Sequence, residues 1–243
     1  MVLGVIVLVI VVIGALVVGG FFGSPVSTRS PAELAERTPA ALGEAPGLGY
    51  DLSIEVGEGV ALMGLDSSGL IDLQAGRFSG SADGGQAQSM LLFGGPDGGS
   101  VVLADGLFVQ TEDGPWEAVP AENAAQLRSF LDPASISTLA RLAIEGSEID
   151  PATRTTPCGP ATCQVVNLTL PTQAIGLVVG QLTGQEQPAP IDLLPVKAEL
   201  WLDQDTGFPR RIAVDATAGG TTTKIVLELE RLEPPPVINP PVP

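Results

Sequence analysis

Residues 196–230 read VKAELWLDQDTGFPRRIAVDATAGGTTTKIVLELE and contain three alternating segments separated by two turns. The turns hold Asp205-Thr206-Gly207 and Ala218-Gly219-Gly220. A period of two is typical of strands with one buried and one solvated face, so the pattern predicts three consecutive antiparallel strands. Apolar residues fall on alternate positions at Val196, Ala198, Leu200 and Leu202, then at Ile212, Val214 and Ala216, then at Ile225, Leu227 and Leu229.

The same alternation appears toward the N-terminus. In Tyr50–Val56, the apolar residues Leu52, Ile54 and Val56 alternate with polar ones. The dipeptide Asp105-Gly106 favours a tight hairpin turn. Further strands are predicted at Leu70–Gln74, Gln88–Phe93, Ser100–Ala104 and Leu107–Thr111.

Two helical segments interrupt these strands. In Ala121–Ile144, Asp132 is suited to the N-cap and Pro133 to the first helical position. The second segment, Ala174–Leu182, is apolar nearly all round. The sequence therefore predicts an α+β fold, in which a strongly curved antiparallel sheet, or half-barrel, carries helices packed in its concave face.

The N-terminal segment decides the compartment. Residues 2–22 carry no charge, and a helix of this length spans about 30 Å, the thickness of the bilayer hydrocarbon. No basic region precedes the segment, and the sequence after it is a poor cleavage site. We therefore expect residues 1–23 to be an uncleaved, single-pass transmembrane signal anchor in the cell membrane, with a cleaved signal peptide as the alternative.

The two ends of the remaining chain have the composition of linkers. Residues 24–48 are rich in Pro, Ala, Ser and Glu, and predict a tether with one short helix at Pro31–Arg37. Residues 233–243 carry too many prolines for a helix or a central strand, and predict an extended, solvated tail, with a docking motif as the alternative. The folded domain is therefore expected at residues 49–232.

The chain has two cysteines, Cys158 and Cys163, on either side of a Gly159-Pro160 turn. A disulfide is the expected state, and a ring this small stabilises a fold by about 2 kcal/mol. A redox pair and a zinc half-site are the competing interpretations, but zinc needs four ligands and the chain has no histidine. A disulfide favours a location of the folded domain outside the cytoplasm.

Charge and composition exclude several functions. The chain has 28 acidic and 11 basic side chains, and a net charge of -17 opposes binding to nucleic acid. Without histidine there is no Ser-His-Asp or Cys-His catalysis. The carboxylate pairs Asp203/Asp205 and Glu228/Glu230 lie on predicted solvated faces, and no calcium-loop pattern surrounds them. We expect no catalytic residue, no metal and no cofactor.

Several short segments of this sequence resemble those of a bacterial protein family. They are the Asp105–Glu117 hairpin, the Phe130–Pro133 helix junction, the short helix near Pro171, and the segment Leu200–Arg210 with its Trp-x-Asp-x-x-Thr-Gly-x-Pro pattern. In order and kind, they resemble the LolA-like half-barrels, and among them the LppX/LprAFG envelope lipoproteins. The resemblance covers about residues 49–232. The chain departs from these lipoproteins because no cysteine follows the apolar segment, and because of its cysteine pair.

The resemblance implies a function. Such proteins bind acyl chains of lipids or lipoproteins in a cavity between sheet and helices, and hold or hand them over in the cell envelope. The alternative is an envelope interaction or sensor module, whose core is filled and whose surface contacts a protein partner. The candidate lining residues of a cavity are Leu131, Ile136, Leu139, Leu142, Ile175, Leu177, Val178, Leu200, Ile212 and Leu227.

Overall fold

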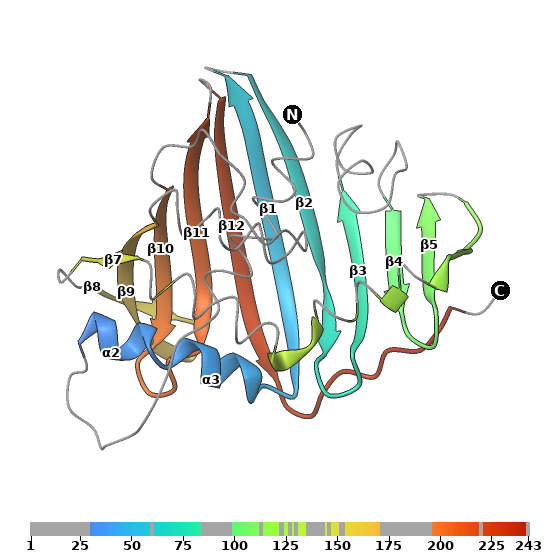
Figure 1. Cartoon of the computed structure of the whole chain (residues 1–243), viewed down its shortest axis with the longest axis horizontal. Helices are drawn as coiled ribbons and strands as arrows, with labels where there is room; N and C mark the ends of the chain where they lie inside the picture. The colour runs from blue at the N-terminus through green and yellow to red at the C-terminus, as the bar shows by residue number, and fades with distance from the viewer. Residues whose placement is uncertain are drawn as a thin grey trace, which may run out of the picture.

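The computed structural model is an open, curved antiparallel sheet with short helices against one face (Figure 1). The structure describes residues 30–58, 61–83, 99–111, 114–121, 124, 125, 128, 131–134, 144, 147–150, 154–170, 196–218 and 221–241. The strands are β1 (Gly47–Glu58), β2 (Ala61–Asp72), β3 (Arg77–Asp83), β4 (Gly99–Leu103), β5 (Leu107–Thr111), β6 (Glu117–Val119), β7 (Glu148–Ile149), β8 (Arg154–Cys158), β9 (Ala161–Leu170), β10 (Val196–Asp203), β11 (Pro209–Ala218) and β12 (Thr221–Leu232).

The described strands form a 12-stranded sheet in the order β6-β5-β4-β3-β2-β1-β12-β11-β10-β9-β7, and β8 also pairs with β9. The pairs for which registers are defined are antiparallel, so each half of the sheet is a meander. The first and last strands meet in the middle, where Leu52 lies opposite Leu227. This pairing joins the N-terminal and C-terminal meanders into one surface.

The three predicted C-terminal strands are confirmed as β10, β11 and β12. Their register places Leu200 opposite Ile212 and Ile212 opposite Leu227, so these side chains share one face. We call this the inner face. The opposite, outer face carries Trp201, Arg211 and Glu228 at the alternate positions.

The N-terminal strands match the predictions in part. β1, β4 and β5 lie where alternation predicts them. The predicted strand at Leu70–Gln74 is wrong in its extent, because β2 begins at Ala61 and ends at Asp72, where a turn follows. The predicted strand at Gln88–Phe93 lies outside the described residues.

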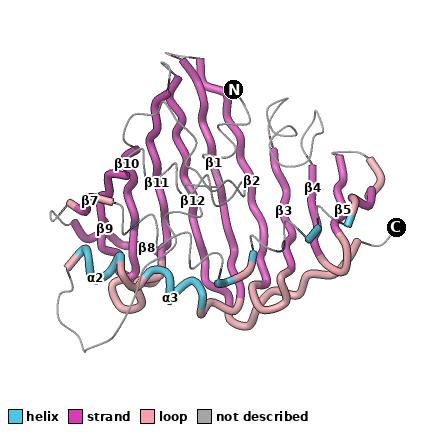
Figure 2. Tube along the Cα trace, viewed as in Figure 1, coloured by secondary structure: helices cyan, strands magenta, loops and turns pink. Residues whose placement is uncertain are grey.

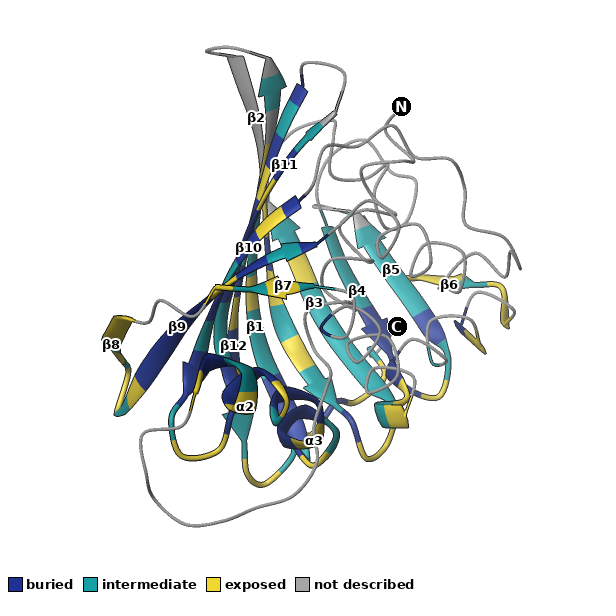
Figure 3. Cartoon of the chain, turned by 60° about the vertical axis from the view of Figure 1, so that its left-hand side comes forward, coloured by how far each residue is buried: buried dark blue, intermediate teal, exposed yellow. Residues whose placement is uncertain are grey.

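The described part of the predicted tether, residues 30–46, is folded against the sheet. It forms α2 (Pro31–Ala35), begun by a capping box between Ser30 and Glu33, and α3 (Thr38–Gly43). Leu34 and Leu42 are each only 1% exposed and belong to the main core cluster. The packed part of the chain therefore begins well before residue 49, with α2 and α3 near one end of the strands on the concave side (Figures 2 and 3).

The predicted helical segment 121–144 is partly described. Ala121, Ala124, Ala125, Arg128 and Leu131 are helical, and Asp132 interrupts the helix at the predicted N-cap. The predicted helix at 174–182 and the apolar segment 2–22 lie outside the described residues. Within the described part of the chain, no helix is long and apolar enough to span a membrane.

The proline-rich tail docks on the sheet, whereas the sequence predicts a solvated terminus. Ile238 is 4% exposed and packs with Val102, Ala104 and Trp116. The Arg77 guanidinium donates a hydrogen bond of 2.9 Å to the carbonyl oxygen of Ile238. Proline has no backbone N–H and cannot donate a hydrogen bond to a neighbouring strand. An extended tail that is not paired as a strand does not need this hydrogen bond, and it can still bury one apolar side chain.

Candidate functional site

The inner face is filled over β9 to β12. Leu200 is fully buried there, and Ile212 and Leu227 are 1% and 4% exposed. All three share a cluster with Leu34 and Leu42 from the helices. These three candidate lining residues therefore belong to a packed core in this structure.

The other candidate lining residues lie elsewhere. Leu131 is 9% exposed and packs with Ala124, Leu103 and Leu107 over β4 and β5. It thus lies on the inner face, over β4 and β5. The remaining candidates lie outside the described residues, and are Ile136, Leu139, Leu142, Ile175, Leu177 and Val178.

Over β1 to β4, by contrast, the inner face is covered unevenly, because Leu48, Ile54 and Leu103 are buried and other apolar side chains are not. Several of its apolar side chains are half-buried and pack against the edges of the two inner clusters. Figure 3 shows this change across the sheet, from dark blue on β9 to teal on β3. We call these half-buried residues the inner-face patch, and they are Tyr50, Leu52, Ile71, Phe78, Ala82 and Val101.

Two glycines form the floor of the inner-face patch. Gly69 and Gly80 lie opposite each other in β2 and β3. A Cβ atom on Gly80 would lie 2.4 Å from the Tyr50 hydroxyl, and one on Gly69 would lie 2.7 Å from the Tyr50 ring. The rings of Tyr50 and Phe78 are stacked, with centroids 5.8 Å apart. Side-chain-free backbone thus lets two aromatic rings lie close against the sheet.

A short hydrogen-bond chain fixes Tyr50. The Ser67 hydroxyl donates to the carbonyl oxygen of Ser81 at 2.9 Å, and it lies 3.3 Å from the Tyr50 hydroxyl. Because a serine hydroxyl has one hydrogen, Tyr50 is the donor in the second bond. Burial raises the pKa of the Tyr50 phenol above 10.0. The Ser67 hydroxyl offsets part of this rise in the pKa, because it can turn to donate to the phenolate, and the nearby Asp51 carboxylate raises the pKa further.

The ionisation of Tyr50 gives a direct test, because it is the one tyrosine of the chain. We expect the tyrosinate absorbance of the folded protein to appear at a pH above 10, and that of the unfolded chain near 10.0. The raised pKa stabilises the fold fully below pH 10, and this contribution is lost as the pH rises from 10 through the folded pKa. A spectrophotometric titration with and without denaturant measures both midpoints. A folded midpoint at or below 10 would contradict the buried position of the phenol.

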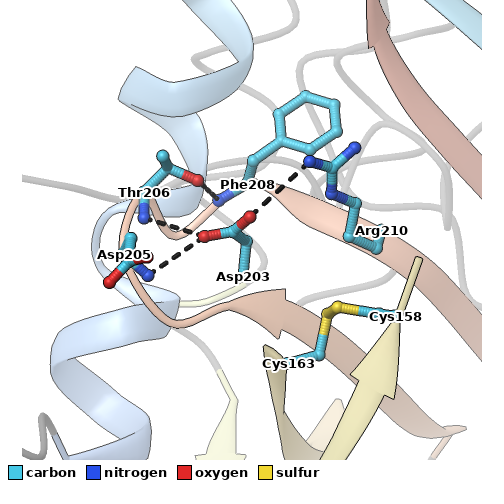
Figure 4. Close-up of a disulfide and its surroundings, with 7 residues drawn as sticks. All are labelled: Cys158, Cys163, Asp203, Asp205, Thr206, Phe208 and Arg210. Atoms are coloured by element: carbon cyan, nitrogen blue, oxygen red, sulfur yellow. Dashed lines mark hydrogen bonds and ion pairs between the residues drawn. A yellow bond between two sulfur atoms is a disulfide. The ribbon is translucent and has the colours of Figure 1, made fainter. Parts of the chain in front are cut away.

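The turn between β10 and β11 connects the sheet to the helices (Figure 4). The Asp203 carboxylate accepts hydrogen bonds from the backbone N–H groups of Asp205 and Thr206, at 3.0 and 3.1 Å. The next residue, Gly207, has a φ of +76°, and Thr38 donates a 3.0 Å hydrogen bond to its carbonyl. The phrase Trp-x-Asp-x-x-Thr-Gly-x-Pro therefore has a structural role in docking α3 on the sheet.

The predicted disulfide is confirmed. Cys158 and Cys163 are bonded across the turn between β8 and β9, beside the β10–β11 turn (Figure 4). Among the described residues, no group of three or more potential ligands is arranged to hold a metal ion.

The inner-face patch could be predicted only in part. Alternation in the sequence places Tyr50 and Leu52 on a buried face. The position of Gly69 opposite Gly80 depends on the register between β2 and β3, for which the sequence gives no signal.

Comparison with known proteins identifies the fold. No protein-family model matches the sequence, and no curated protein sequence matches it. The solved structure of the lipoprotein LppX from Mycobacterium tuberculosis is similar, with 14% identity, a TM-score of 0.53, and coverage of 86% of this chain and 98% of that chain. LprF from Mycobacterium bovis is similar too, with 13% identity, a TM-score of 0.53, and coverage of 91% and 100%.

A LolA-superfamily protein from Nitrosomonas europaea aligns with 9% identity and a TM-score of 0.32, over 85% of this chain and 96% of that one. The likeness to LppX and LprF shows that the chain has their fold, which confirms the LppX/LprAFG-type fold expected from its sequence.

Proposed function

We propose, from this LppX-type fold, that the chain is an extracytoplasmic protein that binds acyl chains of lipids or lipoproteins. The acyl chains lie on the inner-face patch, above the Gly69–Gly80 floor. Residues 2–22 anchor the protein in the membrane, so that it holds or hands over acyl chains close to that membrane. The protein acts by binding, without catalysis, and needs no cofactor.

The observation that carries this proposal is the contrast between the two halves of the inner face. Core side chains over β9 to β12 are almost completely buried, while the apolar side chains of the inner-face patch keep some accessibility. Apolar surface that remains accessible beside a packed core is the kind of surface that apolar ligands cover. The segments predicted at 121–144 and 171–182 supply the remaining wall in this proposal, with Leu139 and Ile175 facing the ligand.

The geometry also favours an elongated ligand over a compact one. Tyr50 and Phe78 present ring faces, and Leu52, Ile71 and Val101 present branched aliphatic groups. Among the residues of the patch, the Tyr50 hydroxyl is the one polar side-chain group, and it is hydrogen-bonded to Ser67 beside the patch. An acyl chain requires only apolar contact along its length, which such a surface provides.

The test fills the inner-face patch by one substitution. Ala82 lies on the inner face and its neighbour Ser81 on the outer face, because successive strand residues alternate. We expect Ala82→Trp to lower the amount of lipid retained per chain about tenfold, since the indole occupies the space of the acyl chain. Native mass spectrometry of the full chain, released from detergent and followed by lipid extraction, measures the retained lipid.

The matched control is Ser81→Trp, which adds the same side chain one residue away on the other face. It should retain lipid as the unmodified chain does, and circular dichroism should show that both variants are folded. Equal loss in both variants, or a chain that is empty and takes up no added phospholipid, would contradict lipid binding. The empty chain would instead favour the interaction module with a filled core.

A further inference from the structure

The outer face carries a groove that the lipid-binding proposal does not use. Its volume is about 740 Å³, and it crosses the ends of β2, β1, β12, β11 and β10 on the face opposite the helices. The tip of the disulfide-bonded hairpin, residues 157–160, borders one side of the groove. The large and charged side chains that line it include Asp51, Leu70, Trp201, Arg211, Glu228 and Glu230. Arg210 lines it as well, and its guanidinium is paired with the Asp203 carboxylate at 3.6 Å.

A second, smaller hollow extends the groove. Its volume is about 330 Å³, and it shares Asp51, Ser68 and Glu228 with the first while reaching Asp66 and Ser81. From β10 to β2 there are four strand spacings, about 19 Å, which is the length of about six extended residues. The groove therefore has the length of a short extended peptide.

The arginine at the β11 end is already paired. The Arg211 guanidinium lies 5.3 Å from the centre of the Trp201 ring and 2.6 Å from a Glu228 oxygen. The Trp201 indole donates to Glu199 at 2.6 Å, and Glu199 also pairs with Arg154 at 2.9 Å. This network holds the Trp201 ring in place and neutralises the charge of Arg211.

The rest of the groove has uncompensated negative charge beside an apolar contact. Asp51, Asp66 and Glu230 are exposed, and none of them forms an ion pair with another described residue. Leu70 is 41% exposed, one of two large apolar residues with such exposure in the described chain. Unpaired carboxylates around an accessible leucine are complementary to a segment that carries both cationic and apolar side chains.

We propose that this outer groove is a docking site for an extended, basic segment of a partner protein. Lysine or arginine side chains of the segment pair with Asp51, Asp66 and Glu230, while an apolar side chain packs against Leu70. The disulfide and its two flanking prolines keep the hairpin wall in a fixed position, so little ordering is needed on binding. Because the groove faces away from the inner-face patch, docking does not require the lipid site to be empty.

A defined peptide tests the proposal. The full chain is placed in nanodiscs of phosphatidylcholine, and a fluorescein-labelled octapeptide of alternating lysine and leucine is titrated by fluorescence anisotropy. We expect Asp51→Asn with Glu230→Gln to weaken binding about tenfold, and Leu70→Ser to weaken it several-fold. Binding should also weaken with added salt.

The matched control removes the same charge elsewhere on the outer face. Glu55 and Asp215 are exposed, lie opposite Lys224 in the register, and do not line the groove. The variant with Glu55→Gln and Asp215→Asn should bind within about twofold of the unmodified chain. Equal weakening in both double variants would assign binding to net charge and overturn the proposal.

Four other results would also overturn it. One is the absence of binding by the lysine-leucine peptide, and another is equal binding by a glutamate-leucine peptide of the same length. If spermine competes with the peptide at the same affinity, the site recognises small cations instead of a protein segment. Self-association that Leu70→Ser abolishes, without peptide binding, would assign the groove to a second copy of the chain.

Discussion

Replacing Phe208 by alanine is expected to lower the free energy of unfolding by about 3–5 kcal/mol. Phe208 is 1% exposed and is the bulkiest of the fully buried side chains described in the chain. It follows the tight turn that Thr38 contacts, and it belongs to the cluster that joins α2 and α3 to the inner face. Its removal leaves a cavity at the point where the helices dock.

Urea unfolding followed by circular dichroism measures this change. The control is Val237→Ala, which truncates an apolar side chain that is 83% exposed and should cost less than about 0.5 kcal/mol. A loss below about 1 kcal/mol for Phe208→Ala would show that the helices are not held by this contact. The two variants together separate burial from the loss of apolar atoms as such.

The substitution Gly69→Ala is expected to have the second largest effect, about 3 kcal/mol of destabilisation, at the upper end of the usual range for overpacking. The added Cβ would lie 2.2 Å from the Ser79 carbonyl oxygen and 2.7 Å from the Gly80 Cα. These are backbone atoms of β3, so the two strands must separate to admit the methyl group. Lipid retention should fall with it, because the floor of the inner-face patch is displaced.

Gly43→Ala is the matched control for Gly69→Ala. Gly43 ends α3, and a Cβ atom there would meet nothing within 4 Å. It should leave the free energy of unfolding unchanged or raise it by up to about 1 kcal/mol. Since the close contact at Gly69 is to backbone, adding Tyr50→Ala should not rescue Gly69→Ala. A rescue would mean that the Tyr50 ring, and not β3, sets the close approach.

The sequence predicts some strands well because local pattern and tertiary burial agree there. In β10 to β12, the inner face is buried and the outer face solvated, so side chains alternate cleanly. The hairpin of β4 and β5 is predicted from Asp105-Gly106, because the preference of this dipeptide for a tight turn depends on the local sequence alone. For these strands, packing in the folded protein buries the same face that the alternation of the sequence marks as apolar.

β2 and β3 could not be predicted in the same way. Their inner-face positions include Ser67, Gly69 and Gly80, which have low strand propensity and no apolar signal. These residues occupy strands because the ring of Tyr50 from β1 covers them, an interaction that depends on register. The inner-face patch was therefore predictable at Tyr50 and Leu52 but not at its floor.

The sequence predicts the ends of the folded unit wrongly for a different physical reason. Proline, alanine and glutamate around Leu34 resemble a linker in composition, yet a capping box and proline at the first helical position suffice for a short helix. Such a helix is stable only because its few apolar side chains are buried against the sheet. The composition of a segment shows how polar it is. It does not show whether the folded protein has an apolar surface on which the segment can pack.

The pairing of β1 with β12, which we call the seam, determines the order in which the protein is able to fold. β1 to β6 and β7 to β12 are each built from neighbours close in the chain, so either meander can begin to form by itself. β1, which begins at Gly47, cannot pair with β12 until Leu232, near the C-terminal end of the chain, has been synthesised. During synthesis, β1 is an open edge for most of that time, which exposes it to pairing with other chains. Closure of the seam is therefore expected to be the late, slow step of folding, and it coincides with arrival of the last strand.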